Sequence, residues 1–261
     1  MNLMKAINNQ VNAQELEQRV KKMYREVALH PEVTYHFEMG RALAERLGYP
    51  TEMLDKIPQE AIASFAGVGY YFDLAQIQEG EAVVDLGSGS GMDAFYAALQ
   101  VGAKGEVFGL DMTPEQLEKS TSLKEQYHFP QTYFIENYIE TPSFVSNSID
   151  VVISNGVINL SSQKDQVFDA AARILKPGGR LAISDIVTTV QLPENISCNV
   201  SLWAACIGGA IPETDYLSLI ESAGLKVIEV NENPYQFLSK GARGATEKYG
   251  IKSISVLAVK A

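Results

Sequence analysis

The stretch Asp85-Leu86-Gly87-Ser88-Gly89-Ser90-Gly91-Met92-Asp93 decides the fold, because it lies where an apolar run is followed by a helical pattern. Residues 82–84 before it are apolar, and residues 94–99 after it have the composition of a helix. Glycine at alternate positions lets the turn take positive φ and lets a ligand approach the backbone closely. The helix that follows offers free N–H groups and a positive dipole end. The stretch therefore predicts a strand–turn–helix unit with a ligand at the turn.

Apolar runs and amphipathic stretches alternate along the rest of the chain. Near-continuous runs of Val, Ile and Leu, separated by amphipathic helices, favour a parallel sheet covered on both faces. We therefore expect an α/β fold with a doubly wound, mostly parallel, seven-stranded sheet. The expected strands are 82–86, 106–110, 131–136, 149–154, 180–186, 226–230 and 253–259. The expected helices are 92–100, 114–126, 164–175 and 215–223.

Three details of this pattern can be tested against the structure. Thr113 stands in the N-cap position of the helix 114–126, with Gln116 three residues later, as in a capping box. The segment Pro177-Gly178-Gly179 ends the helix that precedes it. The last two strands lack a helix of comparable pattern between them, so we expect an antiparallel pair at the sheet edge.

The N-terminal residues have a different, helical pattern. Apolar residues recur at helical spacing over 14–29 and 39–47, and again over 53–65, where Pro58 interrupts the pattern. We expect residues 1–75 to form a helical cap over the active site and residues 76–261 to form the ligand-binding domain.

The composition excludes several classes of partner. The chain has 261 residues and a formal net charge of −11, which disfavours nucleic acid and anionic membranes as partners. There are two cysteines and no apolar run long enough to span a bilayer, so we expect a cytoplasmic protein without a disulfide framework. A small-molecule substrate remains as the expected partner, and oligomeric state stays open.

The spacing of the glycines restricts the ligand. A dinucleotide site usually has G-x-G-x-x-G, which suits a pyrophosphate, but this turn has G-x-G-x-G between Asp85 and Asp93. Two carboxylates would repel a phosphate and suit an ammonium or sulfonium group.

Further polar residues follow the neighbouring strands. Asp111, which lies 20 residues after Gly91, ends the next strand where a carboxylate can bind two ribose hydroxyls. Asn137 and Tyr138 follow the third strand and would flank a nucleobase, and Asn155 follows the fourth. Together these residues indicate a nucleoside with a cationic amino-acid tail and no phosphate, which S-adenosylmethionine is.

Five segments resemble class I methyltransferases: DLGSGSGMD, VFGLDMT, DVVISNGVINL, ILKPGGRLAISDIV and LWAACIGGA. The nearest group is the arsenite methyltransferases, which are related to the quinone C-methyltransferases, and the resemblance runs from about residue 43 to residue 230. It implies S-adenosyl-L-methionine as cofactor and S-adenosyl-L-homocysteine as product. Asp111 would hold the ribose, and Met112 would pack on the adenine. The implied cofactor-binding residues are Asp85, Gly87, Ser88, Gly89, Gly91, Asp93, Asp111, Met112, Gln116, Asn137, Tyr138, Asn155, Gly156 and Val157.

The departures from that group concern its cysteines. Val68 and Gly156 stand where the arsenic-binding family has cysteines, and the family's N-terminal cysteine pair is missing from residues 29–36. Only Cys206 persists. Trivalent arsenic needs several thiolate ligands, so we expect neither arsenite as a substrate nor any metal site.

Histidines and aromatic residues are the candidates for the acceptor side. His30 and His36 flank the loop that, by the resemblance to the related family, would fold over the substrate. Either could serve as a general base, and a surface position is the alternative. Tyr70 is a further catalytic candidate. The candidate substrate residues are Tyr35, Tyr70, Tyr71, Trp203 and Cys206. The alternatives are core packing for the rings and a buried apolar role for Cys206.

Three functions fit this sequence. The preferred one is a methyltransferase for a small organic acceptor of aromatic or apolar character, which two adjacent tyrosines at 70 and 71 suggest. They could also place a ring near the sulfonium by cation–π attraction. The second is an enzyme of another class, such as a cyclase or isomerase, that retains the cofactor. The third is a non-catalytic cofactor-binding protein.

Overall fold

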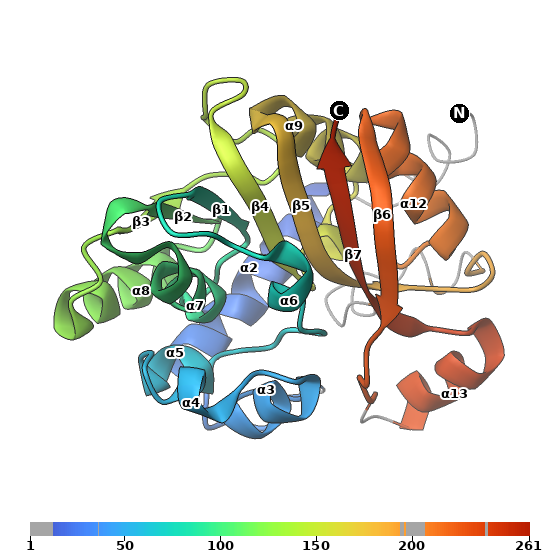
Figure 1. The fold of residues 1–261 in the computed structure, drawn as a ribbon. Coiled ribbons are helices and arrows are strands. Elements are labelled where there is room, and N and C mark those ends of the chain that lie inside the picture. The colour runs from blue at the N-terminus through green and yellow to red at the C-terminus, as the bar shows by residue number, and fades with distance from the viewer. Residues whose placement is uncertain (1–12, 36, 194–195, 197–206, 238–239) are drawn as a thin grey trace.

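The computed structural model describes residues 13–35, 37–193, 196, 207–237 and 240–261. Its centre is a seven-stranded sheet with the order β3-β2-β1-β4-β5-β7-β6 (Figure 1). The strands β1 to β5 pair in parallel, whereas β7 runs antiparallel to both β5 and β6. The prediction of a mostly parallel seven-stranded sheet is therefore confirmed. The strands are β1 (Ala82–Leu86), β2 (Glu106–Asp111), β3 (Thr132–Glu136), β4 (Ile149–Asn155), β5 (Leu175–Val187), β6 (Leu225–Glu232) and β7 (Lys252–Lys260).

Both faces of the sheet are buried, as the nearly continuous apolar strands require. Alternate residues of a strand point to opposite faces, so Val83 joins one hydrophobic cluster and Val84 the other. The first face is covered by α7 (Met92–Val101), and the second by α9 (Lys164–Ile174) and α12 (Glu213–Ser222). α8 (Pro114–Tyr127) contacts β2 and β3 near the sheet edge.

Two expectations about the second half of the chain need correction. Pro177, Gly178 and Gly179 lie inside β5, which begins directly after α9. They form a bulge, because the register jumps from Ile149 opposite Leu175 to Val151 opposite Arg180. A helix, α13 (Lys240–Tyr249), does lie between β6 and β7. Its sequence has two glycines and no large aliphatic residue, so no apolar periodicity revealed it.

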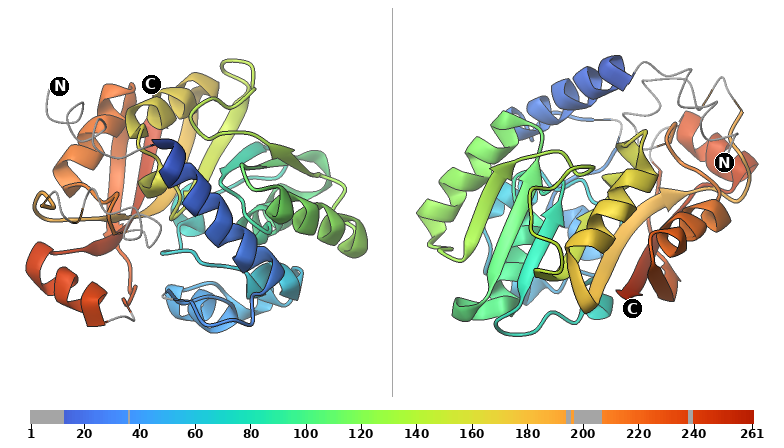
Figure 2. Two further views of the ribbon diagram at one scale, coloured as in Figure 1. Left: turned by 180° about the vertical axis from the view of Figure 1, so that it is seen from behind. Right: turned by 90° about the horizontal axis from the view of Figure 1, so that it is seen from above.

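The N-terminal region is helical. It contains α2 (Ala13–Leu29), α3 (Arg41–Leu47), α4 (Thr51–Leu54), α5 (Gln59–Ala63) and α6 (Phe72–Ala75), and Pro58 separates α4 from α5 as its pattern suggested. Residues of α3 to α6 share one hydrophobic cluster with α7 and β1. α2 lies against α8 instead, as both views of Figure 2 show. The boundary after residue 75 stays a prediction.

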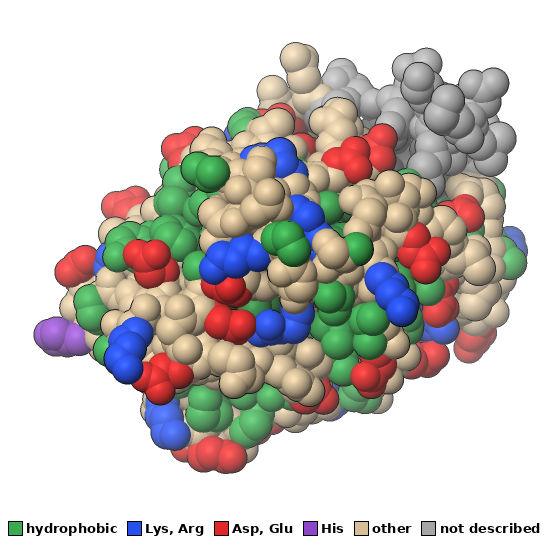
Figure 3. Space-filling view, turned by 45° about the horizontal axis from the view of Figure 1, so that its top comes forward, with side chains coloured by type: hydrophobic (Ala, Val, Ile, Leu, Met, Phe, Trp, Pro, Cys, Tyr) green, Lys and Arg blue, Asp and Glu red, His purple; other side chains and the backbone are tan. Residues whose placement is uncertain are grey.

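The surface and the helices bear on possible partners. On the face that Figure 3 shows, the described Lys and Arg side chains alternate with Asp and Glu, and they form no continuous basic area there. None of the described helices combines the length and apolar character needed to cross a bilayer.

We expect Phe95→Ala to lower the free energy of unfolding by about 3–5 kcal/mol, because it removes a fully buried ring. This ring packs against those of Phe129 and Phe134, with centroid distances of 4.9 and 5.4 Å. Denaturant unfolding measures the change. The control is Val145→Ala, whose side chain is 78% exposed, so its effect should stay within about 0.5 kcal/mol. A Phe95→Ala effect as small as the control would contradict this packing.

Candidate functional site

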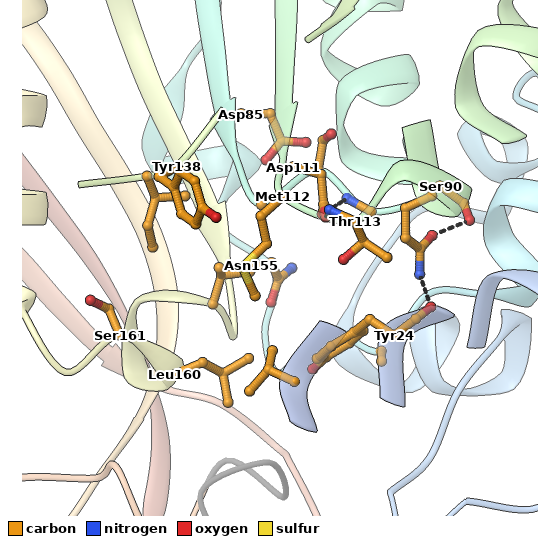
Figure 4. A pocket seen from close by; sticks show the side chains of 18 of the residues that line it. Tyr24, Asp85, Ser90, Asp111, Met112, Thr113, Tyr138, Asn155, Leu160 and Ser161 are labelled. Carbon is orange, nitrogen blue, oxygen red and sulfur yellow. Dashed lines mark hydrogen bonds between the residues drawn. The ribbon is translucent and has the colours of Figure 1, made fainter. Parts of the chain in front are cut away.

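A cavity of about 230 Å³ lies at the carboxyl ends of β1, β2 and β4, which is where doubly wound sheets bind their ligands (Figure 4). The register places these ends together, because Asp85 of β1 lies opposite Gly109 of β2 and Ile153 of β4. α2 closes the opposite side. The wall includes Leu16, Glu17, Val20, Tyr24, Phe65, Asp85, Gly87, Ser88, Gly89, Asp93, Asp111, Met112, Gln116, Asn137, Tyr138, Glu140, Asn155, Val157, Leu160 and Ser161.

The glycine turn forms the floor of this cavity. Gly87, Gly89 and Gly91 have φ of +75°, +52° and +93°, which side chains rarely tolerate. A Cβ on Gly87 would lie 2.4 Å from the Cγ1 of Val157, so only glycine fits there. Gly91 is the N-cap of α7 and does not line the cavity. Glycine is thus needed for the positive φ of the turn and, at Gly87, for the close contact with Val157 in the loop after β4.

Asp85 carries a buried carboxyl oxygen without a hydrogen-bond partner in the described part of this wall. Its side chain is 2% exposed, and its Oδ2 has no hydrogen-bond partner among the described residues. Burial, together with the nearby charges of Asp93 and Asp111, raises the pKa of Asp85 well above its usual value. A buried carboxyl oxygen without a partner is rare in folded proteins, so this oxygen calls for a donor on a ligand. A cationic amine would supply both the donor and the missing positive charge.

Asp93 has a different environment, although it also lines the cavity. Its Oδ1 accepts a hydrogen bond from the Tyr49 hydroxyl (2.7 Å), and its Oδ2 accepts from the Tyr71 hydroxyl (2.7 Å) and from Asn155 Nδ2 (3.0 Å). Burial raises the pKa of Asp93, and these three hydrogen bonds oppose the increase. Asp93 is therefore held mainly by the protein itself.

Asn155 connects this carboxylate to the N-terminal region. Its Oδ1 accepts hydrogen bonds from the backbone N–H groups of Val68 (2.8 Å) and Gly69 (3.3 Å). Its Nδ2 also donates to the Gly69 carbonyl at 3.0 Å. The end of β4 is thus fastened to the segment that precedes α6.

Asp111 ends β2 and shapes the glycine turn. Its Oδ2 accepts from the Gly89 N–H at 2.9 Å, and its Oδ1 accepts from the Thr113 N–H at 2.8 Å. Burial raises the pKa of Asp111, and these backbone donors oppose the increase. Met112 packs beside a small apolar cluster formed by Leu16, Val20 and Leu160.

The capping box expected at α8 is wrong. Thr113 does occupy the N-cap position, but its side chain makes no capping hydrogen bond. Gln116 instead accepts a hydrogen bond from the Ser90 hydroxyl (2.6 Å) and donates to the Tyr24 carbonyl (2.8 Å), as Figure 4 shows. Its side chain therefore joins the glycine turn to α2.

Tyr138 provides a second link to α2. Its hydroxyl donates to Glu17 at 2.8 Å and accepts from Lys21 Nζ at 3.0 Å, although the residue is 43% exposed. Asn137 lines the cavity beside it, and its side chain donates to Ser143 at 3.0 Å. These contacts hold one end of α2 over the cavity.

Val68 and Gly156, the two positions singled out in the sequence by the expected cysteines, lie next to each other. A Cβ built on Gly156 would lie 3.3 Å from the Cγ1 of Val68. Gly156 has a φ of +72° and does not line the cavity, whereas Val157 does.

The candidate catalytic and substrate residues are more scattered. Tyr70 is half-buried, with its hydroxyl 3.1 Å from that of Tyr96, and neither Tyr70 nor the fully buried Tyr71 lines the cavity. The Tyr35 hydroxyl donates to the carbonyl of the exposed His30, and neither lines the cavity. His36, Trp203 and Cys206 lie outside the described residues.

The sequence reasoning missed Tyr49, which holds Asp93 from outside the cavity, and several residues that line the cavity. Tyr49 and Glu140, and the α2 residues Leu16, Val20 and Tyr24, were not expected at the site. The helical period of α2 showed that one face is apolar but not what that face covers. Among the described residues, no group of three or more His, Cys, Asp or Glu side chains could hold a metal ion.

Comparisons with known proteins identify the family of this chain. A family profile described as a methyltransferase domain matches residues 77–224. The arsenite methyltransferase of Halobacterium salinarum is 36% identical over 187 residues, which cover 72% of this chain and 48% of that protein. The arsenite methyltransferase of Homo sapiens is 37% identical over 182 residues, 66% of this chain and 48% of that protein. The chain spans about half the length of the curated relatives it matches.

A solved structure matches more completely. The crystal structure of an arsenic(III) S-adenosylmethionine methyltransferase from Chlamydomonas reinhardtii has a TM-score of 0.63 and 33% identity. The match covers 85% of this chain and 74% of that one. With a glycine turn, two following carboxylates and a cavity at the same edge of the sheet, this chain belongs to the S-adenosylmethionine-dependent methyltransferase family.

Proposed function

We propose that this protein transfers a methyl group from S-adenosylmethionine to a small organic acceptor of aromatic or apolar character, and not to arsenite. The observation that carries the cofactor assignment is the buried, unpartnered Oδ2 of Asp85 beside a turn that admits only glycine. Asp85 would receive the amine of the cofactor, and Asp111 would receive the ribose hydroxyls. Met112 and Tyr138, which both line the cavity, would flank the adenine.

When bound, S-adenosylmethionine supplies an activated methyl group on a sulfonium. The protein mainly has to align the acceptor and exclude water, and alignment of this kind contributes about 7–11 kcal/mol to lowering a barrier. The cover formed by α2 and the N-terminal helices supports such exclusion, in line with the proposed role of residues 1–75 as a cap. His36, His30 and Tyr70 remain the proposed bases for an acceptor that arrives protonated.

The composition of the wall supports the choice of acceptor. The described part of the wall contains five acidic residues and no Lys, Arg or His. An acceptor with a phosphate or carboxylate would find no countercharge there. Leu16, Val20, Phe65 and Leu160 supply apolar surface, so a neutral acceptor with an apolar body fits best.

The names of the relatives favour arsenite as the acceptor, but the lack of cysteine thiols in the described part of the cavity wall argues against it. The whole sequence contains two cysteines, and the described cavity wall contains none. Arsenic(III) prefers several soft thiolate ligands, and Val68 and Gly156 offer none.

We expect S-adenosylmethionine and S-adenosylhomocysteine to raise the melting temperature. At a hundredfold excess over its dissociation constant, a ligand stabilises by about 2.7 kcal/mol. Asp111→Ala should abolish most of this gain, because it removes the proposed ribose acceptor and the acceptor of the Gly89 N–H in the turn. Differential scanning calorimetry measures the gain, with the exposed Asp169→Ala as control. Equal stabilisation of wild type and Asp111→Ala would refute the role of Asp111.

Cofactor binding should release a proton from Asp85. Its raised pKa means that the empty site favours the protonated acid, whereas a bound ammonium favours the ionised form. Affinity should therefore rise with pH until the pKa of the empty site is passed. Titration calorimetry in two buffers of different ionisation enthalpy measures the protons released. Asp85→Asn should abolish the release and weaken binding by about tenfold or more, since a hydrogen bond to a charge is lost. Unchanged proton release in Asp85→Asn would assign it to another group.

A screen of small acceptors, scored by release of S-adenosylhomocysteine, tests the reaction itself. Neutral aromatic or apolar acceptors should give turnover, and arsenite should give none because the thiolate ligands are missing. Turnover with arsenite would overturn the proposed acceptor class. Binding of the cofactor without product from any acceptor would favour the non-catalytic alternative, and a converted compound without homocysteine product would favour the cyclase or isomerase.

A further inference from the structure

Two oppositely charged side chains lie buried outside the cavity, against the segment that follows β4. Lys164 is the first residue of α9 and is only 7% exposed, and Asp185 in β5 is fully buried. A buried lysine is rare unless it is paired. At the N-terminus of a helix a positive charge is also opposed by the helix dipole. Neither residue lines the cavity, so their burial needs another explanation.

Lys164 and Asp185 both bind the same short segment, the lysine as a hydrogen-bond donor and the aspartate as an acceptor. Lys164 Nζ donates to the carbonyls of Asn159 (3.0 Å) and Ser161 (2.7 Å). Asp185 Oδ2 accepts from the N–H of Asn159 at 2.8 Å. The backbone of η2 (Ile158–Leu160) and of the residue after it is thus fixed through two carbonyls and one N–H group. Charge-assisted hydrogen bonds of this kind are stronger than those between neutral groups.

Asp185 is in turn held in place from two directions. The hydroxyl of Tyr216, in α12, donates to its Oδ2 at 2.9 Å, and the N–H of Ile186 donates to its Oδ1 at 2.8 Å. Burial lowers the pKa of Lys164 to about 8 and raises that of Asp185 to about 6, while their mutual attraction opposes both shifts. Both groups are therefore charged mainly between these two values, with Glu140 as a further nearby acid.

The segment that they hold is one wall of the cavity. Val157, Leu160, Ser161, Ser162 and Gln163 all line it. Leu160 also packs with Leu16 and Val20 of α2, in the cluster against which Met112 lies, so the position of this segment affects the cover as well.

We propose that Lys164 and Asp185 are positioning residues, which hold the cavity-wall segment 157–163 in the shape that binds S-adenosylmethionine. This inference rests on the proposed function for the identity of the ligand. The claim that the two residues hold this segment rests on geometry alone. Three charge-assisted hydrogen bonds join them to a short stretch that lines the cavity.

The test separates positioning from general stability by a double variant. Lys164→Met alone leaves a buried, uncompensated acid and should destabilise the protein, and Asp185→Asn alone leaves a buried, uncompensated lysine. The double variant K164M/D185N removes both charges, so much of the stability should return. The two hydrogen bonds from Lys164 Nζ do not return, and the amide that replaces the Asp185 carboxylate offers the Asn159 N–H only a neutral acceptor. We therefore expect the dissociation constant for S-adenosylhomocysteine to stay raised by about tenfold or more in the double variant. The control is Lys176→Met, which breaks an ion pair with Asp150 that does not border the cavity.

Hydrogen–deuterium exchange of residues 157–163 in the unliganded proteins gives a second readout. Exchange there should increase in the double variant and not in Lys176→Met. If the double variant retains wild-type affinity and wild-type exchange, the proposal is overturned. If it does not fold, Asp185→Asn serves for both measurements with a smaller expected change, because it replaces only the charge-assisted bond to the Asn159 N–H by a neutral one, and wild-type affinity and exchange in it overturn the proposal. Failure of wild-type protein to bind the ligand would instead refute the proposed function, and exchange would still decide the role of the pair.

Discussion

The buried carboxylate of Asp93 is the constraint on which the site depends. A carboxylate without a cationic partner is costly to bury, so its oxygens must find donors. The donors are Tyr49, Tyr71 and Asn155, which come from three distant parts of the chain. Satisfying one acid therefore joins the start of α7, the end of β4 and the N-terminal helices. The cavity lies beside this junction, and another acid of its wall, Asp85, keeps an oxygen without a partner among the described residues.

The helix α2, which covers the cavity, is also held by polar side chains whose hydrogen-bond partners are distant in sequence. Gln116 joins the glycine turn to α2, and Tyr138 bonds to two charged side chains of that helix. The wall at 157–163 is held from behind by Lys164 and Asp185. Each side of the site is thus fixed by hydrogen bonds between segments far apart in the sequence. A preorganised site of this kind suits a reaction in which alignment does most of the work.

Local patterns predicted the fold and the location of the site well. Near-continuous apolar strands indicated a parallel sheet, and glycines at alternate positions indicated the turn at the end of β1. The same reasoning failed where a side chain had a choice of partners. Gln116 fits a capping box by spacing, but Ser90 and Tyr24 take its hydrogen bonds. Tyr71 appeared to be a substrate residue, and it lies buried against Asp93 instead. α13 has no apolar periodicity, so no local signal marked it.

By itself, the sequence determined the order of the strands along the chain, the glycine turn, and the acids Asp85, Asp93 and Asp111 at or near the strand ends. These depend on period, backbone conformation and residue type, which are local properties. Only the tertiary structure decided that Asp85 keeps an oxygen without a partner in the described part of the chain and that Asp93 is fully hydrogen-bonded. The donors to Asp93 come from residues 49, 71 and 155. It also decided that α2 covers the cavity and that Lys164 and Asp185 support its wall. Hydrogen-bond partners that are distant in sequence leave no spacing from which they can be inferred.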